Sequence, residues 1–152
     1  MGALNRLSGE NLALIGACAL LNACQPGGGA DVPGDASDGR PFSQIGPEEA
    51  VYFSGTEPFW GGESSGDTLV YTAPDKIDGR KIAIKRFAGR GGLSFSGRLE
   101  GASFDMTITP GECSDGMSDR TYPMAATLKI GDDTRMGCAW TDAAGFTGPQ
   151  NP

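Results

Sequence analysis

Apolar and polar residues alternate in short runs through the last two thirds of the chain, and this alternation restricts the fold more than any other feature. The clearest runs span residues 81–85, 93–99 and 104–109. Their apolar residues recur at every second position, so an extended strand places them on one face and the polar residues on the other. Turn residues separate the runs, which predicts half-buried strands joined by short connections.

Further runs complete the set, with weaker alternation at residues 51–53, 59–60, 68–72, 122–130 and 134–140. Glu100-Gly101 and residues 131–133 suit hairpin turns. No segment has helical periodicity long enough for a crossover connection, so we expect an antiparallel meander of seven to eight strands. Closing it into a small all-β barrel removes exposed strand edges; a two-sheet sandwich is the alternative.

Composition supports this class and excludes several functions. The chain has 25 Gly and 10 Pro among 152 residues, which favours turns and one modest core, placed at residues 42–145 with a disordered tail at 146–152. A net charge of −7 argues against nucleic acid as a partner. The absence of His excludes Ser-His-Asp and Cys-His nucleophiles and His-rich zinc sites.

The N-terminus has the features of a signal peptide over residues 1–23. Arg6 provides a short basic region, and residues 12–21 form an apolar segment. As a helix this segment is about 15 Å long, half of a membrane's hydrocarbon core of roughly 30 Å. It is therefore expected to be removed rather than to remain as an anchor.

Leu21-Asn22-Ala23-Cys24 resembles the lipobox of bacterial lipoproteins. The resemblance implies cleavage after Ala23 and lipidation of Cys24, which gives a stable membrane anchor. Cys18 follows a similar pattern and is the rival site, and an ordinary secretory signal with incidental cysteines is the third reading. Gln25, rather than Asp, follows Cys24, which by the sorting habit of these proteins implies the outer membrane, facing the periplasm.

Residues 24–41 are expected to be a flexible linker. Residues 25–41 hold five Gly and three Pro and only one branched apolar residue, Val32. Such a segment cannot offset its ordering entropy by burial.

Cys113 and Cys138 are the cysteines left after processing, and the exported compartment is oxidising. We predict a disulfide between them. The rival reading, a redox-active thiol pair, lacks the C-x-x-C spacing.

Three blocks resemble a family of uncharacterised proteobacterial lipoproteins, with similar segments beside META domains: Gly-Thr-Glu-Pro-Phe-Trp at 55–60, the segment 113–123, and Gly-Cys-Ala-Trp at 137–140. The resemblance implies a periplasmic lipoprotein with a compact β domain and supports the pairing of Cys113 with Cys138. It names no substrate.

Two of these blocks hold the candidate binding residues, which combine carboxylates, hydroxyls and aromatic rings: Glu57, Phe59, Trp60, Ser114, Asp115, Asp119 and Arg120. The simpler reading is structural. In it Trp60 plugs one end of the barrel, Glu57 caps backbone amides, and the Asp and Ser side chains bond their own loop. Asp119 beside Arg120 then forms a local charge pair.

We expect no catalytic residues, no metal site and no cofactor. Asp115 and Asp119 match no calcium loop and supply too few ligands. The favoured function is a non-enzymatic module that binds a small molecule or an envelope protein. Inhibition of an external hydrolase such as lysozyme is the alternative. A hydrolase that pairs Glu57 with Asp115 or Asp119 is a third reading.

Overall fold

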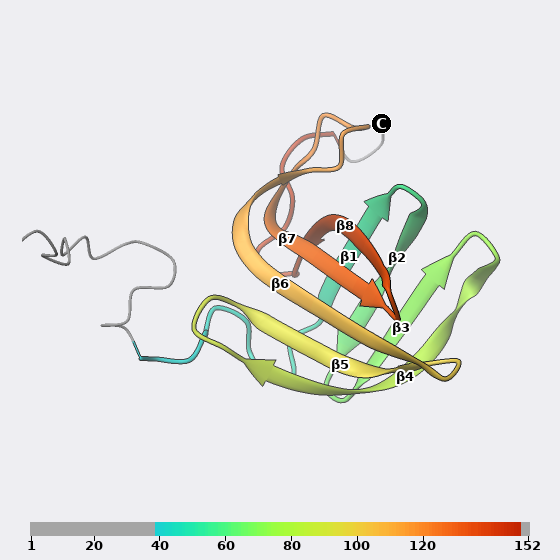
Figure 1. Ribbon diagram of the computed structural model, residues 1–152. Coiled ribbons are helices and arrows are strands. Elements are labelled where there is room, and N and C mark those ends of the chain that lie inside the picture. The colour runs from blue at the N-terminus through green and yellow to red at the C-terminus, as the bar shows by residue number, and fades with distance from the viewer. Residues whose placement is uncertain (1–38, 150–152) are drawn as a thin grey trace, which may run out of the picture. The chain divides into compact units, whose positions relative to one another are not determined.

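The computed structural model describes residues 39–149. The signal peptide, both candidate lipidation cysteines and nearly all of the linker lie outside these residues. Every strand pairs antiparallel with its neighbours in sequence, and β1 also pairs with β8, which closes the sheet into a barrel (Figure 1). The eight strands are β1 Val51–Thr56, β2 Phe59–Ser65, β3 Thr68–Ala73, β4 Lys76–Ala88, β5 Leu93–Leu99, β6 Ala102–Ser114, β7 Thr121–Ile130 and β8 Asp133–Trp140.

The closed antiparallel barrel is confirmed, and the sandwich alternative is wrong. Two strands run longer than their alternation predicts, since β4 and β6 have 13 residues each. Their extra residues pair across register shifts, one between Tyr71 and Ala73 on β3 and one between Pro110 and Cys113 on β6. A shift of this kind bends a strand and interrupts the alternation of apolar and polar residues. The alternation therefore does not reveal the full length of the strand.

The core fills the barrel interior with alternate residues of all eight strands. β1 illustrates the pattern, because Val51 and Phe53 are buried while Tyr52 and Ser54 are partly exposed. An eight-stranded barrel is just wide enough for side chains to fill. The innermost positions are taken by large apolar residues: Phe53, Leu69, Ile82, Leu93, Phe95, Phe104, Met106, Ile108 and Leu128.

The chain itself covers one end of the barrel, which we call the closed end. The Phe42 amide donates to the Gly89 carbonyl at 2.7 Å, and the Ile45 side chain joins the core at 4% exposure. Arg86 reaches up from β4 and donates to the carbonyls of Ile45 and Gly46 at 2.8 and 3.0 Å. The segment before β1 therefore acts as a lid fixed by backbone and guanidinium hydrogen bonds.

The C-terminal segment is ordered further than expected. Phe146 packs on Tyr122 and Trp140, and Thr147 bridges to Thr121. The Arg120 guanidinium donates to the Pro149 carbonyl at 2.7 Å. The prediction of a disordered tail from residue 146 is wrong for residues 146–149, because an aromatic ring in that segment finds an apolar surface. Residues 150–152 lie outside the described residues.

The predicted disulfide joins Cys113 on β6 to Cys138 on β8, with 5.6 Å between their Cα atoms. Cys138 is fully buried, on the outer face of the sheet beneath the end of β6. The bond therefore ties the outlying end of β6 to the barrel wall. Among residues 39–149 no helix is long and apolar enough to cross a membrane.

Candidate functional site

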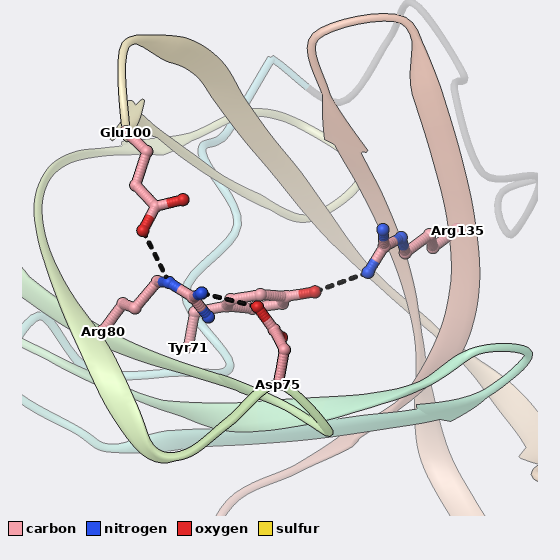
Figure 2. A network of polar contacts seen from close by, with 5 residues as sticks. All are labelled: Tyr71, Asp75, Arg80, Glu100 and Arg135. Atoms are coloured by element: carbon pink, nitrogen blue, oxygen red, sulfur yellow. Dashed lines mark hydrogen bonds and ion pairs between the residues drawn. The ribbon is translucent and has the colours of Figure 1, made fainter.

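The end opposite the lid carries the turns β1–β2, β3–β4, β5–β6 and β7–β8, and we call it the mouth. At its centre lies Tyr71, buried to 2% exposure, whose hydroxyl oxygen accepts a hydrogen bond from Arg135 Nη1 at 2.6 Å. Arg135 also contacts Asp133 at 2.7 Å. The Tyr71 phenol lies on β3 and the Arg135 guanidinium lies on β8. The two residues are 64 positions apart in the sequence, and closure of the barrel brings them together (Figure 2).

A second guanidinium completes this network. Arg80 Nη2 contacts Asp75 at 2.6 Å, and Arg80 Nε contacts Glu100 at 2.9 Å (Figure 2). The Arg80 hydrogen bond holds the pKa of Asp75 below its ordinary value. Burial raises the pKa of Tyr71, although the nearby Arg135 opposes the rise. The network thus brings together the Tyr71 phenol, the two arginines and the acidic side chains of Asp75, Glu100 and Asp133.

An apolar groove of about 340 Å³ lies beside this network. Its lining comes from the start of β2 and from the β3–β4 hairpin: Phe59, Trp60, Gly61, Thr72, Ala73, Pro74 and Ile77. Phe59 and Ile77 are 56% and 79% exposed, so two large apolar side chains stand in solvent at its edges. Exposed apolar residues that gather at a concavity mark a binding surface more often than scattered ones do.

Trp60 is one of the residues that line the groove and is itself almost fully buried, at 4% exposure. Its ring packs 5.8 Å from Phe53 and 6.5 Å from Tyr71. Gly55 and Gly137 make room for it: a Cβ at Gly55 overlaps the indole nitrogen, and one at Gly137 lies 2.9 Å from Cζ2. The indole nitrogen has no hydrogen-bond acceptor among residues 39–149. This placement agrees with a plugging role for Trp60.

The polar β6–β7 loop is organised around Asp115. Its carboxylate accepts hydrogen bonds from the amides of Met117 and Ser118, at 3.0 and 2.8 Å, and from the hydroxyls of Ser118 and Tyr122, at 2.7 and 3.2 Å. These bonds, the Ser118 amide first, lower the pKa of Asp115 to about 2. Ser114 accepts a bond from the Gly116 amide in the same loop. Asp115 therefore stabilises the loop, because its carboxylate oxygens accept hydrogen bonds from amide and hydroxyl groups of the protein.

The structure brings the two predicted clusters near each other without merging them into one pocket. Thr56 Oγ1 donates to the Asp115 carbonyl at 3.2 Å, so the β1–β2 turn touches the β6–β7 loop. Glu57 is exposed and makes no hydrogen bond or ion pair within residues 39–149, which leaves its expected capping role without support. Asp119 is exposed, and the Arg120 guanidinium lies 4.6 Å from the Phe146 ring centre.

Several residues of the mouth were not among the candidate binding residues from the sequence: Tyr71, Arg80, Thr72, Pro74, Ile77, Glu100 and Arg135. A signal did exist for the two arginines. Continuing the period of two from the buried Ile82 and Ala139 places Arg80 and Arg135 on the inner face, where a charged residue requires partners. Ile77 gave no such signal, because its neighbours in the sequence are polar and indicate a turn, although it lies in β4.

The chain shows no match to any protein-family model, curated protein sequence or solved structure compared with it. Within the described range, no three residues of the metal-binding types gather closely enough to hold an ion.

Proposed function

We propose that this protein is an envelope lipoprotein, anchored to the outer membrane through Cys24, whose barrel is a non-enzymatic binding module. The binding site is the groove between Phe59 and Ile77 at the mouth. From its composition, the linker of residues 24–41 is expected to separate the barrel from the membrane surface, where ligands of the periplasm can reach it.

The observation that carries this proposal is the exposure of Phe59 and Ile77 on a groove that the buried Trp60 also lines. Trp60 is packed between rings and glycines, and the β3–β4 turn is tied by Arg80 to Asp75. A site built on a rigid scaffold loses little conformational entropy when it binds. The groove volume of about 340 Å³ is at the lower end of the range for small-molecule sites, about 300–1,000 Å³.

The arrangement of carboxylates favours binding over catalysis. A glycosidase needs one carboxyl group with a raised pKa to act as an acid. The Asp115 carboxylate has its pKa lowered to about 2 and accepts four hydrogen bonds from its own loop, so it is a poor proton donor. Among the candidates only Glu57 and Asp119 carry a free carboxylate.

Binding of an uncharged fluorescent probe, N-phenyl-1-naphthylamine, tests the groove. We expect the dye emission to rise with wild-type protein. We expect the apparent affinity to fall about thirtyfold in Phe59→Ser/Ile77→Ser, since two apolar side chains at about 1 kcal/mol each contribute about 2 kcal/mol. Phe87→Ser is the matched control, because Phe87 is 67% exposed and lies outside the groove. Equal binding by all three proteins contradicts the proposal.

The anchor has a separate test in the intact precursor. Mass spectrometry of the protein extracted from membranes is expected to show a mature chain that begins at Cys24 and carries acyl groups. Cys24→Ser is expected to abolish lipidation, whereas Cys18→Ser leaves it intact. A lipidated chain that begins at Cys18 contradicts the assignment.

A further inference from the structure

The groove lies in an acidic setting. The turns at this end and the strand residues beside them contain six acidic and four basic side chains: Glu57, Asp75, Asp78, Glu100, Asp132 and Asp133 against Lys76, Arg80, Arg98 and Arg135. The excess of acidic side chains is local, since the β1–β2, β3–β4, β5–β6 and β7–β8 turns lie at one end of the barrel. A surface of this sign attracts cations and repels anions.

The guanidinium groups of Arg80 and Arg135 do not reverse this preference, because carboxylates already engage them; Arg98 is exposed and donates to the Gly101 carbonyl of the β5–β6 turn. Arg80 contacts two carboxylates, at 2.6 and 2.9 Å, and Arg135 contacts Asp133 and the Tyr71 hydroxyl. Both side chains are four-fifths buried. An incoming anion must therefore displace carboxylates from short charge-assisted bonds, which costs more than an exposed ion pair returns.

Two carboxylates remain open to a cation. In the chain, Glu57 stands two residues before Phe59 and Asp78 directly follows Ile77, the two exposed apolar residues of the groove. Both are exposed, and neither makes a hydrogen bond or ion pair in the part of the chain that the structure describes. Lys76, also exposed, offsets one of them, so the edge keeps a single excess negative charge.

We propose that the ligand of the groove is a small amphipathic amine. Its apolar part packs between Phe59 and Ile77 against Trp60, and its ammonium group lies at the edge beside Glu57 and Asp78. The volume of about 340 Å³ suits a short alkyl chain or one aromatic ring. This inference rests on the proposed binding function and assigns the charge of its ligand.

Competition between two probes of equal length and opposite charge tests the assignment. Octylamine and octanoate, both below their micelle-forming concentrations at pH 7, compete with N-phenyl-1-naphthylamine for the full-length protein. We expect octylamine to displace the dye at roughly fivefold to tenfold lower concentration, a gap set by ion pairs at an exposed edge. The gap is expected to narrow as salt rises from low to physiological concentration.

Two variants with the same change in net charge locate the effect. Glu57→Gln/Asp78→Asn removes the open carboxylates of the edge, and Glu48→Gln/Asp105→Asn removes two exposed carboxylates outside the groove. Only the first is expected to close the gap between the probes while dye binding persists. An equal loss in both variants overturns the assignment to Glu57 and Asp78.

The outcomes separate this inference from the function on which it rests. If octylamine and octanoate displace the dye equally, or octanoate does so better, the groove binds apolar ligands and the inference is wrong. If the dye itself does not bind in the groove, the proposed function and the inference fail together.

Discussion

The two ends of the barrel are covered in different ways, one by the main chain and the other by side chains. At the closed end the main chain of residues 42–50 crosses the opening, places Ile45 in the core and offers its carbonyls to Arg86. At the mouth no chain segment among residues 39–149 crosses the opening in this way; side chains meet instead, Tyr71 with Arg135 and Arg80 with two carboxylates.

The difference between the two ends determines where a ligand can approach the barrel. A main-chain lid buries its own apolar residues and presents backbone to solvent. A cover of side chains leaves gaps at its margin, and at this margin Phe59 and Ile77 stand exposed. Stability should therefore depend more on the closed end and on the packing beneath the mouth than on the rim of the groove.

The largest expected effect is at the glycine beneath the mouth. Gly55→Ala places a methyl group on the Trp60 indole nitrogen, so the indole must move out of its packed position. We expect a loss of about 3 kcal/mol in the free energy of unfolding, the range for an overpacked core. Gly91→Ala is the control, because a Cβ there meets nothing within 4 Å. Urea unfolding compares them, and equal stability of the two variants contradicts the packing described for Trp60.

A matched pair of isoleucines separates the two ends. Ile45→Ala removes a buried side chain from the lid, with an expected cost of about 2–4 kcal/mol. Ile77→Ala, at 79% exposure on the groove, is expected to change the free energy of unfolding by less than about 0.5 kcal/mol while it weakens probe binding. Comparable losses of unfolding free energy in both variants contradict the claim that the lid stabilises the fold more than the rim of the groove does.

The Tyr71–Arg135 contact is expected to have a smaller effect, about 1–3 kcal/mol, when one partner is removed. Arg135→Met leaves the buried Tyr71 hydroxyl without its donor. Adding Tyr71→Phe removes that hydroxyl and is expected to recover part of the loss, which a double-mutant cycle measures. A cycle with no coupling shows that the two residues do not act together.

The smallest expected effect is on the free energy of unfolding at low pH. The pKa of Asp115 in the folded protein is about 2, below its ordinary value of 3.8. Its contribution to stability is therefore complete above pH 4 and is lost as pH falls from about 4 to 2. Asp115→Asn is expected to flatten this part of the curve of unfolding free energy against pH. Asp119→Asn, in the same loop, serves as the reference and is expected to follow the wild-type curve.

Much of the barrel follows from local pattern, because alternation and turn residues act over a few positions. Residues 93–99 and 104–109 could be assigned to strands, and their hairpin to Glu100-Gly101, from sequence alone. The disulfide followed from the expected compartment and from the number of cysteines left after processing.

The mouth could not be predicted in the same way. The contact between Tyr71 and Arg135 joins residues 64 positions apart and depends on closure of the barrel. Ile77 lies among Lys76, Asp78 and Gly79, where neighbouring residues indicate a turn, and only the extended β4 places it at the groove. Asp115 was a candidate binding residue, and its hydrogen bonds to the Met117 and Ser118 amides agree with the simpler expectation that its side chain bonds its own loop.

The most direct test of the binding site is a titration of the full-length, isotope-labelled protein with octylamine, followed by nuclear magnetic resonance. We expect chemical-shift changes to concentrate at Phe59, Thr72 and Ile77 and at the Trp60 indole, while the lid residues Phe42 and Ile45 stay unchanged. Shift changes centred on the lid, or spread evenly over the barrel surface, contradict a binding site at the mouth.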